Sequence, residues 1–559
     1  MNIKRCGFTV PIAIVAVAVV AAGLGAHPGS LLAQAIAQNQ NAPTNSSDRS
    51  ADRTATNASP ADDRDAKILQ ELEVMRARIQ ELEAQLKQRS GVSGAIEKVE
   101  SAPPSTASAS RFAGTNTAGS TAKAAEQAAS ALPAPTKTPK AEPFAFADFT
   151  WLNGNPRTKT PALDTKFFTP EIRTDVDYVY DFNHPQDNTI GGSSEVFRAN
   201  EFQMTQLGVG GDFHFDNVRA RLMTQFGMYS QTTPRNDAST ARGQWNLDGA
   251  YRYVSEAYGG YHFDVMHGIN VDAGIFMSYV GLFSYYNFDN WAYQPSYVSS
   301  NTPWYFNGLR VQAFPTDKLK FEGWFVNGWQ SYGKFNKRPG LGMQVLWRPN
   351  GWLSILGNQY GVGRDTLGVT GRTRWHSDDS IQIKYYDRPD RMVDKAAFSL
   401  TVDAGCESGG GVSCFGNRSG GPKQSFLGFM LYNRVWFHKD LYAVTVGGGA
   451  INNPGRYLVL LPPINGATAA SGTPYFTENP GDPYKAWDAS ATFDYMPSQY
   501  ITFRWEFNHR AANVPYFSGG GGITPPGGNT GAPGSFVPGF TPDLRKTENR
   551  FNLAILVKF

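Results

Sequence analysis

The last eleven residues of the chain, from Asn549 to Phe559, alternate between two kinds of side chain. Every second residue from Phe551 onward is large and apolar, and the series is Phe551, Leu553, Ile555, Val557 and Phe559. Because successive side chains of a β-strand point to opposite faces, these residues share one apolar face. A free apolar strand edge invites pairing with other chains, whereas a closed membrane barrel has no free edge. The pattern favours a membrane barrel, and an edge strand of a soluble sandwich is the alternative.

The same period of two begins at Ile172 and recurs along most of the remaining chain. Near its start, Val176 and Tyr178 alternate with Asp175 and Asp177. A strand with charges on one face needs water on that face, and its apolar face needs lipid or a core. Most of these segments approach the length of about 9–11 residues that a tilted membrane strand requires. We predict sixteen strands, near 172–182, 203–215, 218–229, 253–265, 268–278, 306–315, 318–329, 340–349, 352–361, 379–388, 394–402, 424–437, 440–451, 485–496, 499–510 and 549–559.

Short and long connections alternate between these segments. Tight turns with turn-forming residues are expected at 216–217, 266–268, 315–317, 349–351, 438–440 and 497–498. Long polar or Gly/Pro-rich connections are expected at 230–252, 279–305, 403–423, 452–484 and 511–548. Outer-membrane barrels have short periplasmic turns and long external loops. The predicted fold class is therefore an all-β transmembrane antiparallel β-barrel of about sixteen strands, with both termini in the periplasm.

Composition excludes several other classes of protein. Aromatic residues make up 13% of the 559 residues, charged residues make up 18%, and the mean hydropathy is −0.38, which does not describe a helical membrane protein. A barrel with a lipid-facing wall and a wet lumen averages to such values. The formal charge of +3 falls to +1 without Lys4 and Arg5 of the leader described next, so no nucleic-acid partner is implied.

Residues 1–37 have the features of a secretory leader. Lys4 and Arg5 precede an apolar run, and small residues follow up to Ala37. Cleavage is expected before Gln38, with a second candidate site at residues 33–35. An uncleaved inner-membrane anchor is the competing interpretation, because the apolar run is nearly long enough to span a bilayer.

A different period follows the polar, disordered segment expected at 38–65. Apolar residues at spacings of four and three form a heptad seam over 66–89, which predicts a parallel coiled coil. An amphipathic helix lying on another surface is the alternative. The seam residues are Ile68, Leu72, Met75, Ile79, Leu82 and Leu86. A linker rich in Ala, Ser, Thr and Pro is expected at 90–148, then a pre-barrel segment at 149–171 and the barrel at 172–559.

Cysteines and catalytic motifs give little sign of chemistry. Cys406 and Cys414 can close a small disulfide loop in an oxidising compartment, and two free thiols are the alternative. Neither a metal-binding Cys/His spacing nor a G-x-S-x-G, H-E-x-x-H or Walker motif occurs. We therefore predict no catalytic residue, no metal and no cofactor. An outer-membrane hydrolase with a site assembled from distant residues stays an alternative.

Two stretches of the chain resemble a known family. They are DVDYVYDFN at 175–183, and the aromatic run YVGLFSYYNFDNW at 279–291 with YQPSY at 293–297 and TPWYFNGLR at 302–310. They are similar to the OmpL-like porin-2 family of outer-membrane β-barrels, over about 170–559. Phosphate-selective porins are the nearest rival family. The alternating C-terminal strand ending in phenylalanine also resembles the signal that the barrel-assembly machinery recognises in such proteins.

The expected function is that of a porin in the outer membrane of a Gram-negative bacterium. Sixteen strands leave an aqueous channel, whereas eight fill with side chains. Passive diffusion of small hydrophilic solutes or ions is favoured over anion selectivity and over a structural tether to peptidoglycan. The candidate pore-lining residues are Asp175, Asp177, Arg219, Arg221, Arg310, Glu322, Arg434, Asp494, Arg504 and Glu506. The coil predicts a homo-oligomer, by analogy with porins a trimer, with its N-terminal part in the periplasm.

The leader generates a direct test. Removal of residues 1–37 by a signal peptidase would leave Gln38 as the first residue of the mature protein. Intact-mass measurement of protein purified from outer membranes checks this expectation. A mature chain that still began at Met1 would contradict the leader.

Overall fold

The computed structural model describes the C-terminal three quarters of the chain and three residues of its N-terminal part. The described residues are Glu73, Ala77 and Gln80, which are helical, and 142–559 without 191–194, 235–236, 238–242, 362–370, 417–422, 456–482 and 522–542. The chain divides into two compact units, Met1–Ser105 and Thr106–Phe559. The predicted leader, the polar segment, the coiled-coil seam and the linker up to residue 141 lie outside the described residues.

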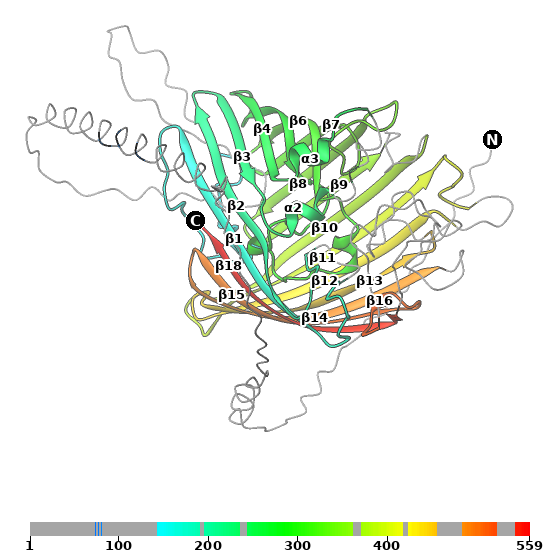
Figure 1. Cartoon of the computed structure of the whole chain (residues 1–559). Helices are drawn as coiled ribbons and strands as arrows, with labels where there is room; N and C mark the ends of the chain where they lie inside the picture. Colours follow the sequence, from blue (N-terminus) through cyan, green and yellow to red (C-terminus); the bar gives the residue numbers. More distant parts are fainter. Residues whose placement is uncertain are drawn as a thin grey trace, which may run out of the picture. The chain divides into compact units, whose positions relative to one another are not determined.

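Sixteen antiparallel strands close into a barrel, as the sequence predicts. Figure 1 shows β1 and β18, the first and last strands of the barrel, lying side by side where the sheet closes. The strands are β1 (Phe168–Asp181), β2 (Phe202–Phe215), β3 (Val218–Thr224), β4 (Val254–Phe263), β5 (Ile269–Met277), β6 (Tyr305–Thr316), β7 (Leu319–Val326), β8 (Gly340–Asn350), β9 (Leu353–Gly361), β10 (Thr373–Asp387), β11 (Val393–Ser408), β12 (Ser425–Phe437), β13 (Tyr442–Asn453), β14 (Tyr484–Ser498), β15 (Ile501–Ala512) and β18 (Thr547–Lys558).

The remaining elements are short and belong to connections. They are η1 (Thr150–Leu152), α2 (Tyr229–Thr232), α3 (Leu247–Tyr251), η4 (Asn287–Asp289), α4 (Tyr297–Ser300) and the separate two-stranded sheet of β16 (Phe517–Ser518) and β17 (Leu544–Arg545). Within the described residues, no helix is long and apolar enough to cross a membrane.

The wall of the barrel alternates between lipid-facing and inward-facing side chains. In β14, Trp487 and Phe493 are exposed on the outer face, while Asp488 and Asp494, which directly follow them, are buried on the inner face. In β18, Phe551, Ile555 and Phe559 of the predicted C-terminal pattern are exposed on the outer face. The register with β1 continues to the end of the chain, where Phe559 donates its backbone N–H to the carbonyl of Ile172 at 2.9 Å. No strand edge is left free where the chain ends.

Three expected segments differ from the structure. The strand predicted at 218–229 ends at Thr224, because Gly227 turns the chain with a φ of +87° and α2 begins at Tyr229. The strands predicted at 379–388 and 394–402 are longer, since β10 begins at Thr373 and pairs with β11 as far as Ser408. The barrel begins at Phe168, within the segment predicted to precede it.

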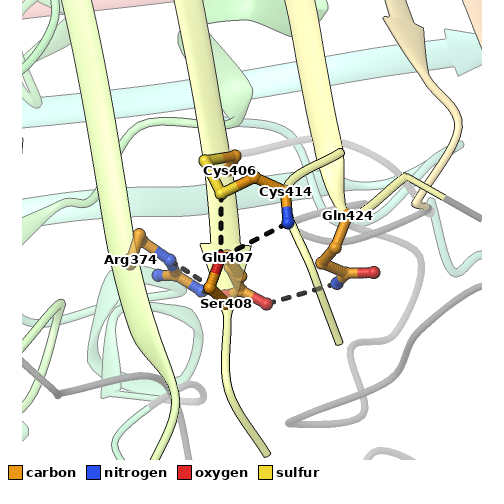
Figure 2. The surroundings of a disulfide bond; sticks show 6 residues. All are labelled: Arg374, Cys406, Glu407, Ser408, Cys414 and Gln424. Atoms are coloured by element: carbon orange, nitrogen blue, oxygen red, sulfur yellow. Dashed lines mark hydrogen bonds and ion pairs between the residues drawn. A yellow bond between two sulfur atoms is a disulfide. The ribbon is translucent and has the colours of Figure 1, made fainter. Parts of the chain in front are cut away.

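A disulfide joins Cys406 and Cys414 (Figure 2). Because β11 extends to Ser408, Cys406 lies in the strand and not in the loop expected at 403–423, while Cys414 lies in the connection that follows. The Ser408 hydroxyl accepts a hydrogen bond from the backbone N–H of Cys414 at 3.3 Å. The bond therefore fastens the start of a long connection to the end of a strand.

We expect this disulfide to stabilise only its local loop. Closing so short a loop contributes ~2–3 kcal/mol in the chain-entropy model. The double variant Cys406→Ser with Cys414→Ser should keep the barrel's heat-modifiable electrophoretic mobility and gain protease cleavage near residue 414. Two thiols that react with an alkylating agent in the unreduced wild-type protein would contradict the bond.

Candidate functional site

The connection between β5 and β6 folds into the barrel and is called here the inner segment, residues 279–304. Most of its side chains are buried, and its backbone contacts inward-facing side chains of the wall. The Glu506 carboxylate of β15 accepts the backbone N–H groups of Tyr293 at 2.7 Å and Gln294 at 2.8 Å. Arg504, two residues earlier, donates to the carbonyls of Asn287 at 3.1 Å and Asn290 at 2.7 Å. A cation and an anion two residues apart on one strand thus provide hydrogen-bond partners for backbone groups of a segment that has no strand pairing.

Charged side chains of other strands hold the segment in the same way. Asp488 of β14 accepts the Ser296 hydroxyl at 2.7 Å and the backbone N–H of Tyr297 at 3.1 Å. Arg434 of β12 donates to the carbonyl of Trp291 at 3.0 Å and pairs with Asp494 at 2.7 Å. A buried backbone group without a partner is costly, so these contacts are what permits a segment without strand pairing to lie inside the barrel.

Glycines in the wall let α4 of the inner segment approach closely. A Cβ atom on Gly449 of β13 would lie 2.6 Å from the Ser296 hydroxyl, and one on Gly428 of β12 would lie 2.9 Å from the Val298 side chain. Real Cβ atoms essentially never come so close to another atom. The small residues of β12 and β13 therefore make room for this turn of helix.

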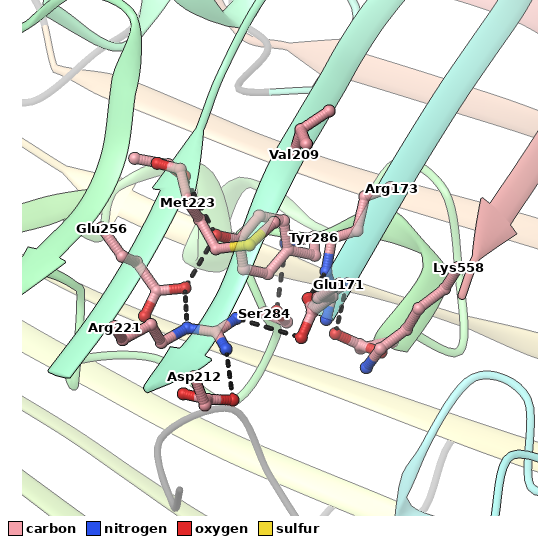
Figure 3. A network of polar contacts seen from close by, with 12 residues as sticks. Glu171, Arg173, Val209, Asp212, Arg221, Met223, Glu256, Ser284, Tyr286 and Lys558 are labelled. Carbon is pink, nitrogen blue, oxygen red and sulfur yellow. Dashed lines mark hydrogen bonds and ion pairs between the residues drawn. The ribbon is translucent and has the colours of Figure 1, made fainter. Parts of the chain in front are cut away.

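The opposite end of the segment contacts a polar cluster on β1 to β4 (Figure 3). Arg221 forms ion pairs with Asp212 at 2.9 Å, Glu256 at 3.0 Å and Glu171 at 3.2 Å. The Tyr286 hydroxyl donates to Glu256 at 2.8 Å. Arg221 thus holds three carboxylates of the wall together, and one of them, Glu256, also fixes an aromatic side chain of the inner segment.

Asp289 of the inner segment is bound by cations from both sides of the barrel closure. It pairs with Arg173 of β1 at 2.8 Å and with Lys558 of β18 at 3.4 Å. Burial raises the pKa of Asp289, but the charges of Arg173 and Lys558 outweigh burial and hold the pKa below its usual range. The carboxylate is therefore ionised at neutral pH and keeps the two contacts.

The residues before β1 cross the short-turn end of the barrel and are called here the mouth segment, residues 142–158. The Phe144 backbone N–H donates to the carbonyl of Asp317 at 2.6 Å, and the Trp151 indole donates to Gly351 at 3.1 Å. The Thr158 hydroxyl donates to Gln499 at 2.6 Å. The turns after β6 and β8 lie on roughly the opposite side of the sixteen-strand barrel from the turn after β14. The mouth segment contacts all three turns and therefore bridges this opening. The linker predicted at 90–148 therefore ends earlier, since Phe144 is buried against Phe314.

The mouth segment and the inner segment also contact each other. The Gly154 backbone N–H donates to the Asp289 carbonyl at 2.9 Å, and the Gly154 carbonyl accepts Arg434 at 2.7 Å. Arg434 thus contacts the wall, the inner segment and the mouth segment at once. A single guanidinium connects three parts of the chain that are far apart in sequence.

A cavity of about 120 Å³ remains between the two segments and the wall of β7 to β10. Its polar wall residues are Lys320, Gln344, Arg348, Ser354 and Gln382. The inner segment covers it from Tyr279 to Asn290, and Phe144, Leu152 and Asn153 of the mouth segment line its other end. The volume holds several water molecules. The cavity is a place within the described part of the lumen that has room for a small solute.

All ten candidate pore-lining residues lie on inward-facing positions, but they do not border open water. Nine are buried, with at most 7% of the residue exposed, and the tenth, Arg221, has 11% of its side chain exposed. Asp175, Arg434, Arg504 and Glu506 contact the inner segment directly, and Asp494 holds two of these arginines. Arg219 and Arg310 pair with Asp272, Glu322 pairs with Lys320, and Asp177 accepts the Thr205 hydroxyl.

Sequence reasoning missed several buried charged residues of the inner face, namely Asp488, Arg510 and Arg348. Asp488 and Arg510 follow the same inward alternation as their neighbours and could have been included on that ground. Arg348 lies in the stretch Trp347-Arg348-Pro349-Asn350, which the turn residues mark only as a strand end. Among the described residues, no group of three or more His, Cys, Asp or Glu side chains could hold a metal ion.

Comparison with known proteins identifies one family. The model of the family described as "Putative beta-barrel porin-2, OmpL-like" matches residues 174–537. A search of curated proteins found no match.

Several solved structures are similar. OmpT of Vibrio cholerae has 10% identity and a TM-score of 0.38, over 71% of this chain and 99% of that one. The outer membrane channel DcaP of Acinetobacter baumannii has 12% identity and a TM-score of 0.37, over 70% of this chain and 96% of that one. An anion-selective porin from Comamonas acidovorans has 9% identity and a TM-score of 0.38, over 70% of this chain and 99% of that one.

The contacts of Arg504 generate a prediction for the inner segment. In Arg504→Ala, the carbonyls of Asn287 and Asn290 lose their donor, and breaking a buried pair costs on the order of 3–5 kcal/mol. We expect chymotrypsin to cut the purified variant between residues 279 and 304, where the wild type resists. Mass spectrometry of the fragments locates the cuts. The control Arg545→Ala removes an exposed arginine, and equal cleavage of all three proteins would contradict the role of Arg504.

Proposed function

This chain belongs to the family described as "Putative beta-barrel porin-2, OmpL-like", and we propose that it lets small hydrophilic solutes diffuse passively across the outer membrane of a Gram-negative bacterium along the β7 to β10 side of its lumen. The observation that carries this proposal is the cavity on that side, because the inner segment packs against the inward faces of β1, β12, β14 and β15. The passage is therefore narrow, in contrast to the wide water-filled lumen expected from strand number alone.

The charges on most of the inner wall support a passage that discriminates only weakly between anions and cations. Several arginines and carboxylates of the inner face pair with each other, as Arg434 does with Asp494 at 2.7 Å and Arg219 with Asp272 at 3.3 Å. Paired charges contribute little net field to a passing ion. Anion selectivity remains the alternative, and it depends on Arg348, which has no carboxylate partner among the described residues.

A polar group on the outer wall supports the proposal of a homo-oligomer. Trp375 and Tyr385 mark two aromatic levels of β10 and are ten residues apart, roughly 25 Å along the axis of a tilted strand. Between them Asp379 is exposed on the outer face and accepts the Ser377 hydroxyl at 2.8 Å, which in turn accepts the Gln359 amide. Lipid tails offer this carboxylate no donor. A second copy brought alongside by the predicted coil would cover it.

The N-terminal part stays a separate proposal. A parallel coil over 66–89 would hold copies together in the periplasm and could reach peptidoglycan through the linker. The alternating C-terminal residues would direct the barrel to its assembly machinery. Nothing among the described residues favours a hydrolase over a channel.

The mouth segment generates a test of the passage. Deleting residues 142–158 should raise the single-channel conductance in planar bilayers several-fold, because the segment bridges one opening of the barrel. Deleting the equally long linker stretch 112–128 should leave the conductance unchanged. If neither the wild type nor the 142–158 deletion conducts, the channel proposal fails, and if both conduct equally, the mouth segment does not restrict the passage.

The outer polar group tests the oligomer. If Asp379 lies at a contact between copies, Asp379→Leu should reduce crosslinked oligomers of the full chain at least two-fold, with Val402→Leu on the neighbouring strand as the control. If Asp379 faces lipid, the leucine variant would instead have unchanged oligomers and a higher melting temperature. Crosslinking that gives only monomer for the wild type would contradict the oligomer itself.

A further inference from the structure

Arg348 is a buried cation whose positive charge has no counterpart within the part of the chain that the structure describes. Its residue is 4% exposed, and it lines the cavity between the wall and the two inserted segments. Its Nε donates weakly to the Ser354 hydroxyl at 3.4 Å, and its Nη1 atom has no hydrogen-bond partner. Five other inward arginines each form an ion pair with a carboxylate, and they are Arg219, Arg221, Arg310, Arg434 and Arg504. A buried guanidinium in this state carries a large desolvation cost.

Two aromatic rings of the mouth segment compensate only part of that cost. The Arg348 guanidinium carbon lies 5.1 Å from the centre of the Phe144 ring and 4.8 Å from that of Phe149. Aromatic rings attract the faces of a guanidinium, but its N–H groups point outward in its plane and need acceptors. The rings therefore hold the side chain in place and leave its edge toward the cavity available.

The surroundings of the cavity add hydrogen-bonding groups and leave the charge of Arg348 unbalanced. Lys320 of β7 also lines the cavity. Its ammonium group is neutralised by the Glu322 carboxylate at 2.6 Å, and Glu322 itself does not line the cavity. Asp289, the one carboxylate of the lining, is already bound to Arg173 and Lys558. Gln382 and Ser354 contribute an amide and a hydroxyl. The unbalanced charge of the cavity is that of Arg348, and it is positive.

We propose that this cavity binds a small oxyanion, a carboxylate or inorganic phosphate, against the edge of Arg348. A guanidinium presents parallel N–H groups that match two oxygens of one anion, and it does so better than it matches a spherical ion such as chloride. The cavity of about 120 Å³ accommodates such an anion with a few waters. The site rests on the proposed function in one respect: its ligand would be a solute of the same passage.

The mouth segment takes part in this site because Phe144 and Phe149 both stack on Arg348. An anion at the guanidinium edge would strengthen the ordering of these rings, and release of the segment would expose Arg348 to the short-turn end of the barrel. The site therefore lies where a solute would pass from the cavity toward that opening.

Binding can be measured without any conductance. We would titrate the full mature protein in detergent with sodium phosphate and with sodium acetate at constant ionic strength, by calorimetry. The wild type should bind at least one of the two saturably, and Arg348→Gln should weaken that binding at least tenfold. Arg348→Lys, which keeps the charge and loses the planar fork, should bind more weakly than the wild type and more tightly than Arg348→Gln. The control Arg545→Gln removes an exposed arginine and should bind as the wild type does.

Each other result overturns the proposal. Heat-modifiable mobility identifies the folded protein in each case. If the folded wild type binds neither anion, the site does not exist. If folded Arg348→Gln binds as tightly as the wild type, the anion binds elsewhere. If sodium chloride, titrated in the same way, bound with the same affinity as the oxyanion, the argument for an oxyanion site would fail. Absence of binding in a protein that conducts ions would reject the site and leave the channel, whereas binding in a protein that does not conduct would retain the site and reject the channel.

Discussion

The fold of this protein depends on a backbone constraint: a segment that leaves the sheet and lies inside a membrane barrel must find partners for its N–H and C=O groups. The inner segment finds them on charged side chains of the wall. The Glu506 carboxylate accepts hydrogen bonds from two backbone N–H groups, and the Arg504 guanidinium donates to two backbone carbonyls. One strand therefore provides partners for both the donors and the acceptors of the segment's backbone. These two charges of the inner face therefore hold the inner segment in place, and the Arg504 guanidinium is also paired with the Asp494 carboxylate.

This arrangement couples two parts of the chain that approach the lumen from different directions. The mouth segment reaches Asp289 and Arg434 through the backbone of Gly154, and both of those residues also position the inner segment. Aromatic side chains then fill the space, as where Trp291 packs edge to face on Trp436 with ring centres 5.6 Å apart. Because the two segments share partners, displacing one weakens the other. The cavity beside β7 to β10 lies between these two segments and the wall.

The strands could be predicted from sequence, whereas the filling of the barrel could not. Period-two alternation is local, so most of the sixteen barrel strands are recognisable from their own residues, although the segments at 340–361 and 394–402 are poorly patterned. The alternation of short and long connections then orders the strands. The inward direction of Arg504 and Glu506 follows from the same rule. Their partners do not, because Glu506 binds backbone groups 213 and 212 residues away in a stretch without periodicity. The sequence does not single out Arg348 for a related reason. Only the assembled wall shows that, among the residues described by the structure, no carboxylate pairs with it.

The central claim is that the inner segment fills the lumen and leaves a narrow passage. It is tested most directly by replacing residues 282–302 with a short turn and comparing single-channel conductance in planar bilayers with that of the wild type. The account predicts a small conductance for the wild type and a several-fold larger one for the shortened barrel, which would have the wide lumen that sixteen strands enclose. Equal conductance of two folded proteins would show that the segment does not occupy the passage and would contradict the account.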